Sequence, residues 1–253
     1  MIIDNMKSFI TETKEWQQEH HTNKEQREIP CPRNLHIAVT YRNEMWIHGG
    51  KSNGYHADMY RYQFGKRRWQ LVTPHNKGPL ARFGHRAVVH DTCLFVFGGY
   101  DQHGFTCDTL HKYNFDANHW ERVRYRLDSS HLLGSGSLNG SGTVPNISLE
   151  RYHHDCAQWA GQLVLFGGKS GADEPFNDLW AVDLATELCR AITVQGSERP
   201  TPRWGHSLLL NKHGVGWLFG GRDKVAHFGD TWRLMLTKEG NVPDSPITAR
   251  WTK

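Results

Sequence analysis

Short apolar runs separated by turn residues dominate the pattern of this 253-residue chain. Four of the clearest runs read HRAVVH, CLFVFGG, LVLFGG and GWLFGG. Each run is too short for a typical helix, is rich in aliphatic and aromatic residues, and is bounded by turn residues. The pattern therefore predicts an all-β chain built from short strands.

The predicted strands belong to a unit that recurs four times. Each unit opens with an Arg and, three residues later, a His, and a double glycine follows the His after 13 or 14 residues. The Arg and His pairs are Arg33 and His36, Arg82 and His85, Arg151 and His154, and Arg203 and His206. The glycines are Gly49 and Gly50, Gly98 and Gly99, Gly167 and Gly168, and Gly220 and Gly221. Because the arginines are 49, 69 and 52 residues apart, each unit has room for four strands.

An Asp follows each double glycine, and a Trp closes most units. The Asp residues are Asp58, Asp108, Asp178 and Asp230, and the closing residues are Trp69, Trp120 and Trp251, with Cys189 in the third unit. We expect the glycines to allow close approach of neighbouring chains and the Trp rings to fill the gaps between units. A polar residue that recurs in a buried strand needs a partner, so we expect the Arg and His side chains to hydrogen-bond between units.

The double glycine after a buried strand, the Asp and the late Trp together resemble the kelch repeat, and the resemblance covers almost the whole chain. It implies a single kelch-type β-propeller region over residues 1–253, within a ring of about five to seven blades. The four full four-stranded blades are expected at residues 30–77, 78–126, 151–197 and 198–253.

Residues 1–29 are predicted to be an N-terminal half-blade. Their ungapped match to the second unit pairs Asp4, Met6, Phe9, Glu12 and Trp16 with Asp108, Leu110, Tyr113, Asp116 and Trp120. This match favours strands over the amphipathic helix that residues 2–16 otherwise suggest. We expect the chain to be a fragment of a larger ring, with an unfilled blade interface. The alternative, a blade shared by the two chain ends, is less favoured because the last unit reaches its own Trp251.

One end of the predicted blades gathers the loops before each Arg and after each double glycine, because connections alternate between the two ends of an antiparallel sheet. The kelch resemblance implies a binding surface at this end. The candidate partner-binding residues are Asn34, Lys51, Phe83, Tyr100, Asp101, Tyr152, Lys169, Trp204, Arg222 and Lys224. Aromatic rings beside cations suit a peptide with an acidic residue and an apolar anchor. The alternative is that these rings pack between blades.

Residues 127–150 are rich in Ser, Gly and Asn, and we predict that they form a flexible flap at the same end. The alternative is a surface insertion without a role in binding, since loops accept added length at little cost in stability.

The charge balance excludes some classes of partner. The chain has 30 Lys and Arg against 26 Asp and Glu, without a cluster of basic residues, which argues against nucleic-acid binding. No run of 18 apolar residues occurs, and the N-terminal residues are charged, so we expect no membrane insertion and a cytoplasmic or nuclear location. The five cysteines form no C-x-x-C pair, which predicts reduced thiols rather than disulfides or a zinc site.

The sequence contains little that indicates catalysis. It has no nucleophile elbow, phosphate-binding loop or His-Glu-x-x-His motif. Asp223 and His227 have part of the spacing of an iron site, but Phe219 stands where that site needs an acidic residue. We predict no catalytic residue, metal or cofactor, and a non-catalytic scaffold that binds a protein or peptide. One alternative is the substrate-recognition propeller of a cullin-type ubiquitin ligase, and another is an enzyme or sugar-binding protein that uses the central channel.

Overall fold

The computed structural model describes residues 7–10, 13–18, 20–22, 28–128, 149–240 and 245–253, and for residues 7–10 it describes the backbone alone. Four sheets of antiparallel strands follow one another along the chain, and we call them blades 1 to 4. Blade 1 contains β3 (Ile37–Tyr41), β4 (Glu44–His48), β5 (Met59–Gln63) and β6 (Arg68–Val72). Blade 2 contains β8 (Arg86–His90), β9 (Cys93–Phe97), β11 (Leu110–Asn114) and β12 (His119–Val123). Blade 3 contains β14 (Asp155–Trp159), β15 (Gln162–Phe166), β16 (Leu179–Asp183) and β17 (Leu188–Ala191). Blade 4 contains β19 (Ser207–Leu210), β20 (Val215–Phe219), β21 (Thr231–Lys238) and β22 (Ile247–Thr252).

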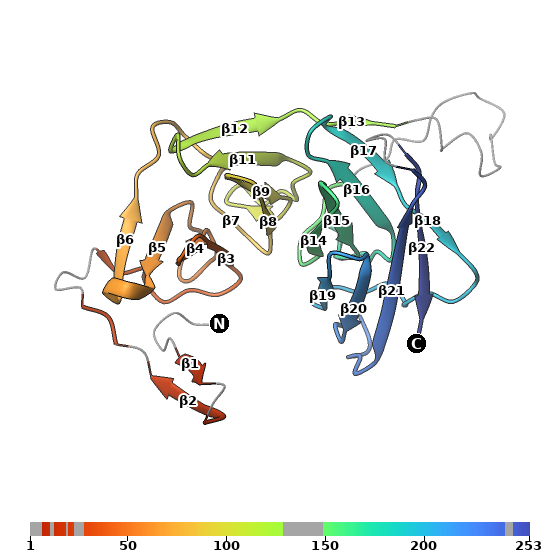
Figure 1. Ribbon diagram of the computed structural model, residues 1–253, viewed down its shortest axis with the longest axis horizontal. Coiled ribbons are helices and arrows are strands. Elements are labelled where there is room, and N and C mark those ends of the chain that lie inside the picture. The colour runs from red at the N-terminus through yellow and green to blue at the C-terminus, as the bar shows by residue number, and fades with distance from the viewer. Residues whose placement is uncertain (1–6, 11–12, 19, 23–27, 129–148, 241–244) are drawn as a thin grey trace.

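The blades are arranged side by side in an arc, with the first strand of each blade on the inside (Figure 1). The inner strands β3, β8, β14 and β19 contact one another in that order. Asp155 on β14 ties three blades together, because its carboxylate accepts hydrogen bonds from Arg86 Nε of blade 2 at 3.0 Å and from the Leu208 backbone N–H of blade 4 at 2.7 Å. An all-β chain whose sheets radiate from a common centre is a β-propeller.

Two short strands extend the outer edges of blades 3 and 4. Strand β13 (Arg126–Leu127) runs parallel to β17, and β18 (Thr193–Gln195) runs parallel to β22. The segment that leaves one blade therefore adds a strand to the next blade. The expected boundary at residue 197 is misplaced for this reason, because residues 193–195 pair with blade 4 rather than blade 3.

The N-terminal residues form two antiparallel strands, β1 (Lys7–Ile10) and β2 (Glu15–Gln18). Phe9 lies opposite Trp16, which is the register that pairs Tyr113 with Trp120 in blade 2. The described part of this segment is therefore strand, as the half-blade interpretation expects and the helix does not. The flap predicted within residues 127–150 lies mostly outside the described residues, which omit 129–148. Among the described residues, no helix is long and apolar enough to cross a membrane.

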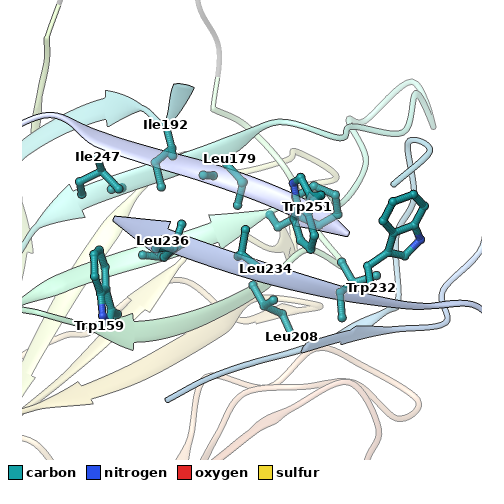
Figure 2. Close-up of a cluster of buried hydrophobic side chains, with 14 residues drawn as sticks. Trp159, Leu179, Ile192, Leu208, Trp232, Leu234, Leu236, Ile247 and Trp251 are labelled. Atoms are coloured by element: carbon teal, nitrogen blue, oxygen red, sulfur yellow. The ribbon is translucent and has the colours of Figure 1, made fainter. Parts of the chain in front are cut away.

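Apolar clusters fill the spaces between neighbouring blades. The cluster between blades 3 and 4 shows the principle: Leu179 of blade 3 packs with Leu208, Leu234 and Trp251 of blade 4 (Figure 2). Residues at the closing position lie opposite the same position of the preceding strand, and these cross-strand pairs are Tyr62 with Trp69, Tyr113 with Trp120, Val182 with Cys189, and Leu234 with Trp251. All four closing side chains are buried. Burial of each large ring contributes about 2 to 3 kcal/mol to stability.

The face of blade 4 that points away from blade 3 is exposed. Leu209, Trp217 and Phe219 are 70%, 53% and 59% exposed, whereas Val164 and Phe166, which take the places of Trp217 and Phe219 in blade 3, are fully buried. The alternation in β20 is therefore that of a blade covered on one side.

The repeat arginines hydrogen-bond within their own blades, which corrects the expectation of bonds between blades. In blade 3, Arg151 Nη1 donates to the Gly167 carbonyl at 3.0 Å, and its two Nη atoms bind the Asp178 carboxylate at 2.7 and 2.9 Å. The equivalent pairs are Arg33 with Asp58 and Arg203 with Asp230. Each arginine thus clamps the double-glycine turn to the strand that follows it.

Blade 2 lacks this carboxylate, and Asp108 does not take the expected position. Arg82 Nη1 donates to Thr109 Oγ1 at 3.1 Å, and the Gly98 N–H donates to the Thr109 carbonyl at 3.2 Å. In blade 3 the corresponding backbone bond runs from Gly167 to Asp178. Thr109 is therefore the equivalent residue, and the sequence alignment through Asp108 is off by one position.

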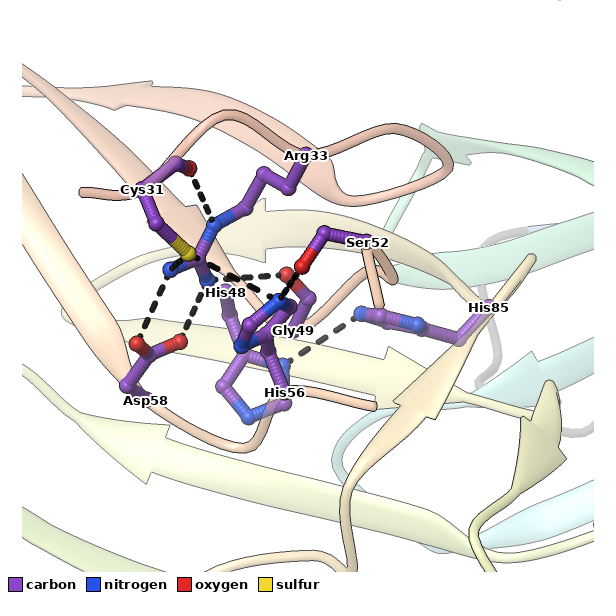
Figure 3. Close-up of polar contacts among 8 residues, drawn as sticks. All are labelled: Cys31, Arg33, His48, Gly49, Ser52, His56, Asp58 and His85. Atoms are coloured by element: carbon purple, nitrogen blue, oxygen red, sulfur yellow. Dashed lines mark hydrogen bonds and ion pairs between the residues drawn. The ribbon is translucent and has the colours of Figure 1, made fainter. Parts of the chain in front are cut away.

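The repeat histidines do contact the preceding blade, but chiefly as rings. His85 Nε2 lies 3.3 Å from His48 Nδ1 of blade 1 (Figure 3). His154 and His206 instead meet Phe97 and Phe166 edge-on, at centroid distances of 5.6 and 5.2 Å, and their ring nitrogens have no hydrogen-bond partner among the described residues. Burial lowers the pKa of His206 to about 3 and that of His154 well below its ordinary value, so these rings are neutral. Among the described residues, His85 is the repeat histidine that makes the expected hydrogen bond to the preceding blade, with His48.

The double glycine is required because the two residues meet histidines of two different blades. A Cβ on Gly167 would lie 2.9 Å from His206 Cε1 of blade 4. A Cβ on Gly168 would lie 2.7 Å from the His154 Cβ of blade 3, the blade to which both glycines belong. Both residues also have positive φ, +61° and +89°. Because a side chain would both clash and strain the backbone, glycine alone fits at each position.

Candidate partner-binding face

Short β-bridges form the candidate face at the end of the blades predicted from the sequence. In each blade the residue after the repeat Arg pairs with the residue after the double glycine. These pairs are Asn34 with Lys51, Phe83 with Tyr100, Tyr152 with Lys169, and Trp204 with Arg222. In blade 2 the bridge forms the short strands β7 (Arg82–Phe83) and β10 (Tyr100–Asp101). Eight of the ten candidate residues therefore occupy equivalent places.

Cations of one blade lie over aromatic rings of the next. Lys51 Nζ is 4.5 Å from the centre of the Phe83 ring, and Lys169 Nζ is 4.7 Å from the centre of the Trp204 ring. Arg222 lies over the Trp204 ring at 5.5 Å. These contacts fall within the range of cation–π attraction. We call the residues Lys51, Phe83, Tyr100, Tyr152, Lys169, Trp204 and Arg222 the cation–aromatic arc.

The rings in the middle of the arc also pack against one another. The centre of the Phe83 ring is 5.6 Å from that of Tyr100 and 6.0 Å from that of Tyr152. Phe83 and Tyr152 are buried, and Tyr100 is half-buried. Most of the surface of the Phe83 and Tyr152 rings is therefore taken up by packing, which was the alternative to partner binding. The cations are the more accessible part of the arc.

Nearby carboxylates already bind some of the cations. Lys169 Nζ donates to Asp173 Oδ1 at 2.5 Å, and Tyr152 Oη donates to the same oxygen at 3.0 Å. Burial alone would lower the pKa of Lys169, but its hydrogen bonds to Asp173 and Tyr152 raise it overall. The hydrogen bond from Lys169 also lowers the pKa of Asp173. Lys224, a further candidate, is paired with Glu174.

Lys51 and Arg222 differ from these paired cations. Within the described part of the chain, neither makes an ion pair with a carboxylate; Lys51 is half-buried and Arg222 is exposed. Their charged groups lie against the Phe83 and Trp204 rings in cation–π contacts instead of against a counter-ion. An incoming carboxylate would therefore find these two cations oriented and uncompensated.

Asp101 has a structural position instead of a surface one. Its side chain is buried, and its Oδ1 accepts hydrogen bonds from the backbone N–H groups of His103 and Phe105 at 2.9 and 3.1 Å. The carboxylate thus orders the loop that follows the double glycine. Asp101 therefore offers a partner little surface, because this carboxylate faces its own backbone.

Three exposed apolar residues at the loop tips were not singled out by the sequence reasoning. Tyr55, Phe105 and Val225 are 39%, 67% and 93% exposed. Each lies a few residues after a double glycine, within loops of otherwise polar residues. A large apolar residue in that setting was the available signal, because isolated loop residues have no strand to pack against.

The central channel offers a different kind of surface. A cavity of about 470 Å³ lies among the inner strands β3, β8, β14 and β19, and aliphatic side chains such as Val39, Val88 and Leu209 line most of it. Thr40 and Gln158 supply hydroxyl and amide groups there. Sugar-binding and catalytic sites need convergent polar groups, so this lining favours neither. Among the described residues, no group of three or more His, Cys, Asp or Glu could hold a metal ion.

Comparison with known families accounts for the repeat. Residues 2–136 and 134–240 match the family described as the KLHDC2/KLHL20/DRC7 Kelch-repeats domain. The chain belongs to this kelch-repeat family. The fold is accordingly a kelch β-propeller, as the sequence resemblance implied.

Several curated kelch-repeat relatives are similar over most of the chain. Human Kelch domain-containing protein 10 is 26% identical over 208 residues, which is 78% of this chain and 43% of that protein. The Drosophila melanogaster leucine-zipper-like transcriptional regulator 1 homolog is 27% identical over 212 residues, which is 82% of this chain and 20% of that protein. Tip elongation aberrant protein 1 of Schizosaccharomyces pombe is 25% identical over 214 residues, 79% of this chain and 17% of that protein. The chain thus spans less than half the length of these relatives.

Proposed function

We propose that this kelch propeller is a non-catalytic interaction module that binds an acidic segment of a protein or peptide on the cation–aromatic arc. The observation that carries the proposal is the pair of ring-stacked cations, Lys51 and Arg222, that lack a carboxylate partner among the described residues. Kelch-repeat membership supports the coarser statement, because the matching family model and the name of Kelch domain-containing protein 10 both describe kelch-repeat domains. A substrate receptor of a ubiquitin ligase would be a special case, since it would use the same face.

The arc suits an acidic peptide for electrostatic and steric reasons. Stacking on Phe83 and Trp204 orients the two cations before a ligand arrives, which lowers the entropy lost on binding. The exposed Phe105 ring and Val225 side chain at the rim would contact apolar residues of the ligand. Charge would therefore guide association, and the apolar tips would add affinity.

The test is to reverse both free charges. We expect the double variant Lys51→Glu, Arg222→Glu to lose at least about tenfold in affinity for acidic dodecapeptides selected from a random phage-displayed library on the unaltered protein. The measurement is fluorescence anisotropy of the selected peptides at two salt concentrations, with weaker binding at the higher concentration.

A matched control reverses two charges at the other end of the blades. Lys66 and Lys212 are exposed and lie in the connections between β5 and β6 and between β19 and β20. The variant Lys66→Glu, Lys212→Glu has the same net charge as the test variant and should bind the peptides normally. Equal binding by both variants, or a library that yields no acidic preference, would refute the proposal.

A further inference from the structure

The candidate face has a second chemical feature at its edge in blade 1, where a thiol, an imidazole and a guanidinium meet. Cys31 Sγ lies 3.7 Å from His56 Nε2, and Arg33 Nη2 donates to the same sulfur at 3.3 Å (Figure 3). Ser52 Oγ lies 2.8 Å from His56 Nε2. Cys31 is exposed, so reagents from solution can reach it.

The repeat explains why a side chain stands here but does not explain the thiol. In blade 4, Thr201 holds the equivalent place two residues before the arginine, and Arg203 Nη2 donates to its hydroxyl at 3.0 Å. In blade 4 an unreactive hydroxyl thus fills the structural role at this position, which is to accept a hydrogen bond from the arginine. Blade 1 places a nucleophile there and adds His56 from the loop after the double glycine.

His56 has the properties of a base for this thiol. Burial, and then the nearby Arg33, lower its pKa from the ordinary value, so the ring is neutral and can accept a proton at pH 7. A nucleophile within hydrogen-bonding reach of a neutral imidazole is the arrangement that activates a thiol. The backbone at His56 is held in place because its N–H donates to the Gly50 carbonyl at 2.9 Å.

The guanidinium of Arg33 donates a hydrogen bond directly to the Cys31 sulfur. Around the sulfur lie Arg33, its counter-ion Asp58, His56 and the phenol of Tyr60. Asp58 offsets part of the positive charge, since it binds both Nη atoms of Arg33. The N–H of Nη2 nevertheless points at the sulfur, and a hydrogen bond from a cation favours the charged form of its acceptor.

We propose that Cys31 is a nucleophilic thiol that soft electrophiles of the α,β-unsaturated carbonyl class alkylate, with His56 as the base. The Sγ–H proton passes to His56 Nε2, and the thiolate forms a bond to the β-carbon of the electrophile. The π electrons of the C=C bond move to the α-carbon, which takes up the proton from His56. No other reactant is needed, and the product is a thioether at the edge of the Lys51 loop.

The chain supplies an internal standard for the test. Cys93 is half-buried and lies beside Thr92, whereas Cys107, Cys156 and Cys189 are buried. The native protein is treated with a substoichiometric amount of N-ethylmaleimide at pH 7, and the modification of each cysteine is measured by peptide mass spectrometry. We expect Cys31 to react at least about tenfold faster than Cys93.

Substitution of the base separates activation from exposure. We expect His56→Gln to lower the Cys31 rate at pH 7 about five- to tenfold, while the Cys93 rate stays unchanged. The matched control His103→Gln alters the corresponding loop of blade 2, where His103 contacts Gln102, and should leave the Cys31 rate unchanged. A Cys31 rate equal to that of Cys93 in the unaltered protein, or an unchanged Cys31 rate in folded His56→Gln, would overturn the proposal.

Discussion

Blades 2 and 3 hold the same buried arginine in two different ways. Arg151 of blade 3 faces the carboxylate of Asp178, whereas Arg82 of blade 2 faces the Thr109 hydroxyl and the Gly98 carbonyl. Burial lowers the pKa of Arg82. In blade 1, which has the carboxylate, burial also acts to lower the pKa of Arg33, but Asp58 raises it overall.

The comparison separates what the arginine needs from what the blade needs. Both arginines donate to the carbonyl of the first glycine, at 2.8 Å from Arg82 and 3.0 Å from Arg151. Those bonds to the backbone shape the turn in every blade. The carboxylate compensates the charge and, through Trp180 Nε1, which donates to Asp178 at 2.7 Å, anchors a ring in the blade interface. A blade can therefore form without the ion pair as long as the backbone bonds remain.

The largest expected effect is the removal of the carboxylate from blade 3. We expect Asp178→Ala to lower the free energy of unfolding by about 3 kcal/mol, because it leaves the buried Arg151 uncompensated. This value is at the low end for a buried pair, since the Asp178 side chain is 38% exposed. The matched change Thr109→Ala in blade 2 should cost about 1 kcal/mol, the loss of one neutral hydrogen bond. Urea unfolding measures both, and equal losses would show that the carboxylate does not compensate Arg151.

An intermediate effect is expected on acidification, because the histidines and the ion pairs titrate in different ranges. The pKa of His206 is about 3, below the ordinary 6.5, so the unfolded chain takes up the proton first. Its contribution to stability is complete above pH 6.5 and is lost as the pH falls toward 3. The hydrogen bond from Arg203 lowers the pKa of Asp230, so that pair is lost only below the ordinary 3.8.

The loss of stability between pH 7 and 5 should therefore depend on the histidine. We expect His206→Gln to reduce this loss by about 2 kcal/mol, as measured by urea unfolding at both pH values. The exposed His213 provides the control, since His213→Gln should leave the loss unchanged. An equal loss in the unaltered protein and in His206→Gln would contradict the proposed role of burial.

The smallest expected effect is a gain from placing a carboxylate in blade 2. Thr109→Asp would give Arg82 the partner that the other three arginines have, and we expect a gain of about 1 kcal/mol in the free energy of unfolding. The neighbouring Asp108 opposes part of this gain by charge repulsion. Thermal unfolding of the variant and of Thr92→Asp, a change at an exposed turn, would measure it. A loss specific to Thr109→Asp would show that blade 2 is built around a neutral residue.

Sequence reasoning located the elements of the repeat but not all of their partners. Spacing placed Trp251 at the closing position although it lies 21 residues after Asp230, because the register of the strands depends on the alternation of buried residues. The same pattern misassigned Asp108, since this acidic residue stands directly before Thr109, which takes the equivalent place in the structure. Likewise, Lys51 and Lys169 were both selected from their position, but Lys169 alone of the two has a counter-ion, Asp173, four residues further on.

The sequence by itself determined the strand pattern, the four full units, the half-unit at the N-terminus and the end of the blades that carries the loops. These features follow from the local periodicity of apolar residues and from the recurring glycines, which mark turns because glycine readily adopts a positive φ. Only the tertiary structure decided that the arginines bond within blades, that the histidines meet rings of the preceding blade edge-on, and that Cys31 meets His56. Those outcomes depend on distances of a few ångströms between side chains from separate loops, which spacing along the chain does not specify.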